Sequence, residues 1–260
     1  DGTLKLKSTV SSGGTLPISV CVNNDLVFVV NSTTANICGF KLGWDGSLTK
    51  IDGSEKSLSD VSAAPAQISF NPWGNGLLVT EKVTNKISAF AIDANGVVTD
   101  SQVNNSVGQT PFGFALARDK FMIVSNAIGG AAGESTCTSY ENLYLDLNDV
   151  NGTVANHQSA VCWVATAKYG RYAFVANTGS NNLNTYYIAP NGALYYLPWT
   201  KAAAGSKPAD LTVSGNNLFV YNINGGDHTI TEFKRSFLGR LQPIGTITSI
   251  PDFAAGIACF

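Results

Sequence analysis

The strongest constraint on the fold of this chain is a four-part pattern that recurs along most of its 260 residues. The clearest part is a short apolar run that ends in a polar residue, and its copies begin roughly 45–51 residues apart. Short apolar runs bounded by turn residues are typical of buried β-strands. The five copies are Leu26–Asn31, Leu77–Glu81, Phe121–Asn126, Tyr172–Asn177 and Leu218–Asn222.

A further strand is predicted after each run, because large and polar residues alternate there. Its copies are Asn36–Leu42, Asn85–Ile92, Asn142–Asn148, Asn182–Ile188 and His228–Lys234. A third part starts with Gly, mostly after Asp or Asn, and such dipeptides favour tight hairpin turns. Its copies are Gly2–Lys7, Gly46–Ile51, Gly96–Ser101, Gly152–His157, Gly192–Leu197 and Gly239–Ile244.

The fourth part precedes each apolar run and often carries Pro near its start, where no ladder hydrogen bond is lost. Its small residues and modest polarity are typical of an innermost strand beside a narrow channel. Its copies are Leu16–Val22, Ala64–Phe70, Thr110–Leu116, Ser159–Ala165, Lys207–Val213 and Ile250–Phe260.

Four strands per repeat at this spacing predict an all-β chain folded as a β-propeller of four-stranded antiparallel blades. The pattern contains five complete blades, one leading outer strand and one final inner strand. We expect Gly2–Lys7 and Ile250–Phe260 to share a closing blade, because closure leaves no sheet edge exposed. Residues 1–260 are therefore interpreted as a single propeller domain of six or seven blades.

Composition excludes some classes of partner. The net charge is −2 with no basic stripe, which argues against nucleic acid. No apolar run approaches the ~18 residues of a membrane span. Asp1 is not a start residue, so we expect a processed or truncated chain from a secreted or cell-surface protein. Abundant Ser, Thr, Asn and Gly fit this location, and three sequons mark possible glycans at Asn31, Asn104 and Asn151.

The chain resembles the secreted fungal proteins known as 3-carboxymuconate cyclases, within the lactonase-like β-propeller superfamily. The resemblance is carried by Leu16–Asn31, Gln67–Asp93, Ser159–Ile188 and Ile250–Phe260, in that order. It implies seven blades, so this chain would lack leading strands and about one blade near Gly13–Leu16. It also implies lactone-forming or lactone-opening chemistry, although many secreted members look like surface glycoproteins or adhesins.

Candidate catalytic residues lie in loops where a propeller channel opens. Glu81 replaces the Asn that ends the apolar run in the other four blades. His157 and His228 are the two histidines, and either suits an acid–base role near neutral pH. The alternative is that each is an ordinary surface residue beside a strand end. The repeated Asn31, Asn126, Asn177 and Asn222 are interpreted as turn formers.

Candidate ligand-binding residues are Gln67, Lys207 and Asp210. An alignment of the inner strands places Ser19, Gln67, Gly113, Cys162 and Asp210 at one position, facing the channel. Asp210 is the one charged member, although a water-filled channel would tolerate it without any ligand. No metal-ligand spacing and no nucleotide fingerprint occur, so neither a metal nor a cofactor is expected.

The five cysteines suggest one disulfide, between Cys137 in a long loop and Cys162 on the next inner strand. Cys21 and Cys38 are expected to lie too far apart to pair, because a strand separates them. Cys259 is expected in the core.

Three functions remain open, one of which is a structural scaffold with no small ligand; the other two are favoured about equally. One of these two is a non-catalytic surface protein that binds carbohydrate or another host or cell-surface ligand through exposed aromatic residues such as Trp73. The other is a lactonase or carboxymuconate-lactonising enzyme that acts on a small lactone at the channel mouth. A cluster of His, Arg and carboxylate at one mouth would favour the enzyme.

Overall fold

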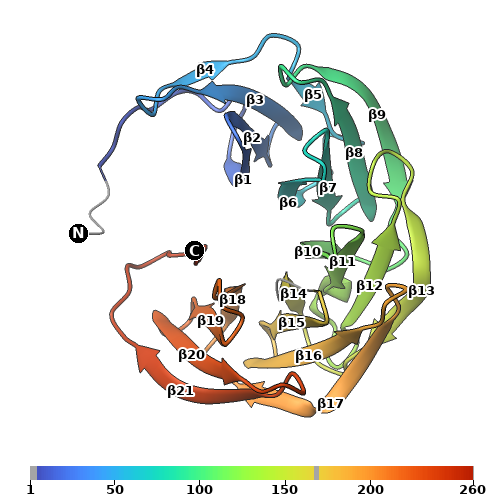
Figure 1. Ribbon diagram of the computed structural model, residues 1–260, viewed down its shortest axis with the longest axis vertical. Coiled ribbons are helices and arrows are strands. Elements are labelled where there is room, and N and C mark those ends of the chain that lie inside the picture. Colours follow the sequence, from blue (N-terminus) through green and yellow to red (C-terminus); the bar gives the residue numbers. More distant parts are fainter. Residues whose placement is uncertain (1–4, 167–169, 260) are drawn as a thin grey trace. The chain divides into compact units, whose positions relative to one another are not determined.

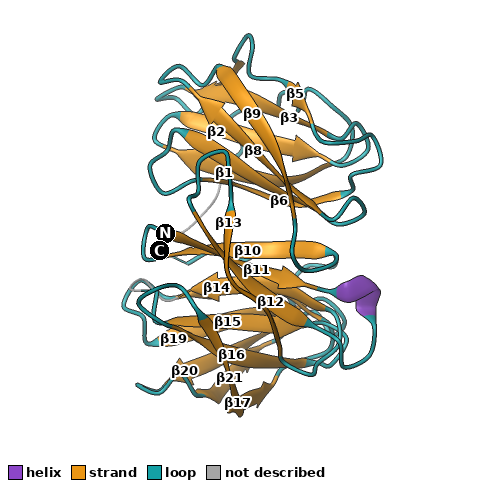
Figure 2. Cartoon of the chain, turned by 90° about the vertical axis from the view of Figure 1, so that its right-hand side faces the viewer, coloured by secondary structure: helices purple, strands orange, loops and turns teal. Residues whose placement is uncertain are grey.

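The computed structural model describes residues 5–166 and 170–259, and its architecture is all-β. Twenty-one strands form five antiparallel sheets, each with four consecutive strands in order (Figure 1). The only helix in the described ranges is a single 3-10 turn, Ile128–Gly130, drawn in purple in Figure 2. The predicted β-propeller of four-stranded antiparallel blades is confirmed.

The chain divides into two compact units, and the first holds blades 1 and 2. Blade 1 consists of β1 (Pro17–Asn23), β2 (Leu26–Asn31), β3 (Asn36–Leu42) and β4 (Leu48–Lys50), with β5 (Lys56–Ser57) also paired to β3. Blade 2 consists of β6 (Pro65–Phe70), β7 (Gly76–Glu81), β8 (Lys86–Ile92) and β9 (Val98–Asn105). Leu26, Phe28 and Val30 of β2 pack against Leu77 and Val79 of β7 in the core between these sheets.

The second unit holds blades 3, 4 and 5. Their first strands lie side by side, and each sheet extends away from them (Figure 1). Blade 3 is β10 (Pro111–Ala117), β11 (Phe121–Asn126), β12 (Thr136–Glu141) and β13 (Asn148–Ala155). Blade 4 is β14 (Val161–Thr166), β15 (Tyr172–Asn177), β16 (Asn182–Ile188) and β17 (Leu194–Ala203). Blade 5 is β18 (Pro208–Val213), β19 (Phe219–Asn224), β20 (Thr229–Arg235) and β21 (Leu241–Ile247).

The same backbone joint recurs at the start of every first strand. The preceding residue has a left-handed φ, as in Lys207 with φ 52°. In blade 5 the N–H of Gly225 donates to the carbonyl of Lys207 (3.0 Å), and the N–H of Gly226 donates to Ser206 (2.9 Å). An equivalent pair of backbone hydrogen bonds is formed before the first strand of each of the other four blades. The left-handed residues are Leu16, Ala64, Thr110, Ala160 and Lys207.

Blade 3 departs from the prediction in its third strand. That strand is Thr136–Glu141, whereas residues 142–147 of the alternating segment form the connection to β13, which begins at Asn148. The predicted hairpin turn at Asn151-Gly152 is also wrong, because both residues lie inside β13. The register shifts there, and the N–H of Gly152 donates to the Asp149 carboxylate, so the dipeptide forms an irregularity within a strand.

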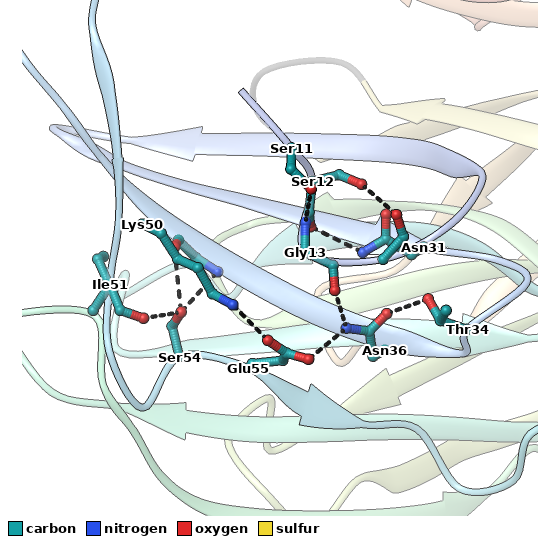
Figure 3. A network of polar contacts seen from close by, with 12 residues as sticks. Ser11, Ser12, Gly13, Asn31, Thr34, Asn36, Lys50, Ile51, Ser54 and Glu55 are labelled. Carbon is teal, nitrogen blue, oxygen red and sulfur yellow. Dashed lines mark hydrogen bonds and ion pairs between the residues drawn. The ribbon is translucent and has the colours of Figure 1, made fainter. Parts of the chain in front are cut away.

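Neither terminal segment forms its predicted strand in the part of the chain that is described. Residues 1–4 and 260 of those predictions lie outside it. The segment Lys5–Gly14 instead crosses blade 1, where Ser8 Oγ donates to Gly46 and Asn36 Nδ2 donates to Gly13 (both 3.1 Å, the latter in Figure 3). At the other terminus, Phe253 has a left-handed φ of 64°, and the N–H of Ile257 donates to Asp210.

Candidate functional site

The connections of each blade gather at two ends, and the predicted site residues separate between them. His157 lies between β13 and β14, and His228 lies between β19 and β20. The arginines of the second unit lie at the opposite strand ends, about 20 Å away along a six-residue strand. The expected cluster of His, Arg and carboxylate is therefore not formed within this unit. The arginines are Arg118, Arg171, Arg235 and Arg240.

Neither histidine lies in a buried polar site. His157 is exposed, with a left-handed φ of 58°, and its carbonyl accepts a bond from Gln158 Nε2 (3.0 Å). His228 Nδ1 lies 3.6 Å from Asp252 Oδ1, and both side chains are largely exposed. His228 takes a left-handed backbone position before β20, as Asn181 does before β16. These placements match the alternative of ordinary residues beside strand ends.

Glu81 is completely buried at the end of β7. One carboxylate oxygen accepts bonds from the Ser59 N–H (3.2 Å) and Ser88 Oγ (2.5 Å). The other accepts bonds from Thr84 Oγ1 (2.6 Å) and from Ser59 Oγ. Four donors match the four lone-pair sites of a carboxylate, so little capacity is left for a substrate. The geometry gives Glu81 a structural role and argues against the predicted catalytic one.

The residues equivalent to Glu81 in the other blades are asparagines, which also form side-chain hydrogen bonds at the end of the second strand. The register pairs each with the first residue of its inner strand, which makes Asn224 the member in blade 5 instead of the predicted Asn222. Asn224 Nδ2 donates to Thr229 and Thr231 (both 2.9 Å), and Asn126 Nδ2 donates to two threonines of β12. None of these asparagines has a left-handed φ, but side chains such as that of Asn177, which donates to Asn182 across the following turn, still stabilise the turns.

The three sequons occupy different environments. Asn31 is completely buried, and its Nδ2 donates to the Ser12 carbonyl (3.1 Å; Figure 3), so the predicted glycan does not fit there. Asn104 is half-buried, and Asn151 is exposed. The Asn151 amide exchanges two hydrogen bonds with the backbone of Leu194 (both 3.2 Å). Glycosylation at Asn104 and Asn151 stays a prediction.

The predicted disulfide is absent, and both cysteines are free thiols. Cys137 lies on β12, paired with Ser125 and Val154, because the loop expected to hold it is partly strand. Burial raises the pKa of the Cys137 thiol to about 12. Cys162 Sγ instead donates to the Ala160 carbonyl (3.3 Å). Cys259 is exposed and not in the core, whereas Cys21 and Cys38 are unpaired, as expected.

The side chains predicted to face the channel occupy, in most blades, an equivalent position on the first strand. Its members are the residues that resume pairing after a register shift, Ser19 in β1 and Asp210 in β18. In blade 4 this residue is Trp163 and not the predicted Cys162. Gln67 lies within the corresponding shift of β6 and is half-buried.

Asp210 is the ionisable side chain at this position. Its Oδ1 accepts the N–H of Leu211 (2.8 Å), and its Oδ2 accepts the N–H of Ile257 (3.1 Å). No Lys, Arg or His forms an ion pair with it among the described residues. Desolvation raises the pKa of Asp210 to about 6, although the two backbone bonds oppose this rise. A partly exposed carboxylate with a pKa near 6 suits a general base at neutral pH.

Lys207 is a cation three residues before Asp210 in the chain. It is exposed, and it directly precedes β18 with its N–H donating to Asn181 Oδ1 (2.8 Å). Sequence reasoning identified both Lys207 and Asp210, but it could not identify the Ile257 contact. That contact depends on a segment 47 residues further along the chain.

A separate groove of about 310 Å³ lies in the first unit, where the β1–β2 and β6–β7 turns meet. Trp73 lines it with 57% of its surface exposed, beside Asn23, Asp25, Asn75 and Asp93. Lys41 Nζ donates to Asp25 (2.8 Å) and lowers the pKa of that carboxyl.

The described residues contain no group of three or more His, Cys, Asp or Glu placed to hold a metal ion. Across the same ranges, no helix has the length and apolar character needed to cross a membrane.

The repeated four-stranded blades define the fold class, an all-β propeller. A family model described as lactonase, 7-bladed beta-propeller, matches residues 22–132, from the end of β1 through blade 2 to the first two strands of blade 3. The chain is thus similar to lactonase-like propellers over that range. None of the curated proteins compared with the chain matches it.

Particular solved structures share the fold at low identity. A putative 6-phosphogluconolactonase from Bacteroides fragilis is 20% identical, with a TM-score of 0.81, over 95% of this chain and 74% of its own. The periplasmic gluconolactonase of Pseudomonas aeruginosa is 17% identical, with a TM-score of 0.74, over 89% and 72%. A Lactobacillus plantarum protein is 18% identical, with a TM-score of 0.76, over 91% and 72%. These likenesses establish the fold.

Proposed function

We propose that this protein binds and hydrolyses a small lactone at the first strand of blade 5, with Asp210 as general base. The observation that carries the proposal is a partly exposed carboxylate on an inner strand with no cationic partner among the described residues. Similarity to the lactonase family model supports the reaction class, as do the names of the two gluconolactonase structures. The assignment of the residues rests on the chemistry below.

The reaction adds water across one carbon–oxygen bond. Asp210 takes a proton from water, whose oxygen attacks the lactone carbonyl carbon and forms a tetrahedral oxyanion. The Lys207 ammonium stabilises this negative charge. As the intermediate collapses, the ring C–O bond breaks, and Asp210 returns the proton to the leaving alkoxide. The product is one hydroxy acid, and Asp210 regains its carboxylate form.

The substrate class is tested by turnover of sugar lactones and of carboxymuconolactones, the two chemistries that the family resemblance favours. Ring opening releases an acid, so a pH indicator or a pH-stat measures it with the unmodified protein. Asp210→Asn should lower kcat/KM by about 10²–10⁴-fold, the usual contribution of general-base catalysis. Turnover of neither class, or an unchanged rate in Asp210→Asn, contradicts the proposal. Asp227→Asn is the matched control, since Asp227 Oδ2 only accepts the N–H of Ser206 (2.9 Å) and Oδ1 a Thr229 hydroxyl.

A second candidate function is carbohydrate binding in the Trp73 groove. An exposed indole offers an apolar face for a sugar ring, and the neighbouring Asn and Asp side chains offer hydrogen bonds to hydroxyl groups. For this alternative we propose an adhesin-like protein, secreted or held at a cell surface and glycosylated at Asn104 or Asn151. Trp73→Ala should abolish retention on glycan-coated beads, whereas Trp44→Ala, which removes another exposed tryptophan, should leave it unchanged. Equal retention of both variants excludes this groove.

A further inference from the structure

A basic hairpin joins β20 to β21 in blade 5, at the blade end opposite to Lys207. It borders a half-open cavity of about 470 Å³, lined by Lys234, Arg235, Ser236, Arg240 and Gln242, among others. Three of the lining residues are cations and none is acidic, in a chain whose net charge is −2. Such a concentration of one charge sign favours a negatively charged ligand.

The hairpin is fixed on three sides, so the cavity is preformed. Arg235 Nε donates to the Asn217 carbonyl (2.8 Å), which ties the hairpin to the β18–β19 turn. Tyr172 Oη donates to the Phe237 carbonyl (3.1 Å), and Thr185 Oγ1 donates to the Gly239 carbonyl (2.9 Å). The last two bonds anchor the tip to blade 4. A rigid site loses little entropy when a ligand binds.

The three cations have different tasks. Arg235 is engaged by its bonds to Asn217 and to the Ser236 carbonyl (3.1 Å). Neither Lys234 nor Arg240 forms an ion pair among the residues that the structure describes. Glu232, two residues before Lys234 on β20, does not line the cavity. Lys234 and Arg240 are therefore the charges available to a ligand.

We propose that this cavity binds a phosphate-class anion through Lys234 and Arg240. A guanidinium presents paired N–H donors that match two oxygens of a tetrahedral anion, and an ammonium adds a point charge. Ser236 and Gln242 add neutral donors to the lining. The site lies apart from Asp210, so it would bind its ligand whether or not lactone hydrolysis occurs.

The hairpin tip offers a competing occupant. Phe237 and Leu238 are 76% and 64% exposed, and an apolar tip among basic residues also suits an anionic membrane surface. The Arg171 guanidinium lies 5.5 Å from the centre of the Phe237 ring, so that ring already has a partner on one side. The concave lining, held in place by the hydrogen bonds to blades 4 and 5, favours the small anion, and the membrane becomes an outcome of the test.

The test is titration of the whole protein with inorganic phosphate by calorimetry at low ionic strength. We expect a Kd of millimolar or tighter, and at least about tenfold weaker binding in the double variant Lys234→Gln/Arg240→Gln. Lys201→Gln, which removes an exposed cation from β17, should bind as the wild type does, and so should Asp210→Asn. Arg235 stays intact, and near-UV circular dichroism confirms that the double variant is folded.

Two results would overturn the proposal. One is a phosphate Kd weaker than about 10 mM, or one that the double variant leaves unchanged. The other is binding to phosphatidylserine vesicles, lost in Phe237→Ser/Leu238→Ser, without binding of free phosphate. That second result would assign the hairpin to a membrane surface.

Discussion

Ser19 in blade 1 and Asp210 in blade 5 occupy the same position of their first strands and accept the same kind of bond. Ser19 Oγ accepts the N–H of Ile68 from the next inner strand (3.2 Å), and Asp210 accepts the N–H of Ile257 (3.1 Å). A hydroxyl is thus sufficient for the contact. The carboxylate in blade 5 adds a charge that desolvation disfavours, which points to a use outside the fold.

The largest expected effect comes from converting one partner into the other. Asp210→Ser should keep the strand contact and lose the base, so lactone turnover should fall by about 10²–10⁴-fold while the fold is retained. Steady-state kinetics and far-UV circular dichroism measure the two parts. An unfolded variant would show that the carboxylate serves the fold, and a fully active variant would show that it is not the base.

Glu81, whose carboxylate is completely buried, provides a contrast with the partly exposed Asp210. Glu81→Ala leaves the donors of Ser59, Thr84 and Ser88 without their acceptor, and we expect a loss of about 2–4 kcal/mol in the free energy of unfolding. Glu81→Gln keeps an acceptor and should lose less. Urea unfolding measures both, and if the proposed activity holds, the folded variant protein should turn over lactone at the wild-type rate. A catalytic defect in folded Glu81→Gln would return Glu81 to the active site.

Asp210 should make the free energy of unfolding depend on pH, whereas a serine at the same position should not. The Asp210 pKa is raised from 3.8 to about 6, so the native state keeps a proton that the unfolded chain loses in this window. The free energy of unfolding should therefore fall as the pH rises from 4 to 6, by at most about 3 kcal/mol and by less with solvent screening. Asp210→Ser should lack this contribution. Parallel stability curves for the two proteins would contradict the pKa shift.

The smallest effect is expected at Ser19. Ser19→Ala removes one acceptor from the Ile68 N–H, which should cost about 0.5–1.5 kcal/mol by urea unfolding at any pH between 4 and 8. Ser101→Ala, on the exposed side of β9, is the control and should be neutral. A pH-dependent loss in Ser19→Ala would remove the distinction between a neutral and a charged acceptor.

The fold was predictable where a strand is apolar on both faces. The prediction reproduced Leu26–Asn31, Phe121–Asn126 and Tyr172–Asn177 residue for residue, because only a fully buried strand needs such an uninterrupted run. It missed β12, whose sequence TCTSYE is polar although nearly all of it is buried. Hydrogen bonds such as those from Asn126 to Thr136 and Thr138 make that burial tolerable, and no periodicity reports them.

The candidate site was predictable only as a list of residue types. Asp210 stands out in the sequence as the one charged member of its position, but its raised pKa depends on desolvation by its surroundings in the folded chain. The exchange of Asn222 for Asn224 has a similar cause. Both asparagines lie in β19, two residues apart on one face, and only the pairing with Pro208 shows which one ends the strand.

The backbone joint before each first strand has a consequence for how such a chain can evolve. Its two hydrogen bonds join main-chain atoms alone, and residues as different as Leu16, Ala64, Thr110 and Lys207 occupy its left-handed position. Duplication or loss of one repeat between two such joints would leave every bond of the joint with a partner of the same kind. The number of blades can therefore change by recombination without new side-chain contacts at the joints. Unusual side chains such as Asp210 occur in one blade and do not depend on this repeat.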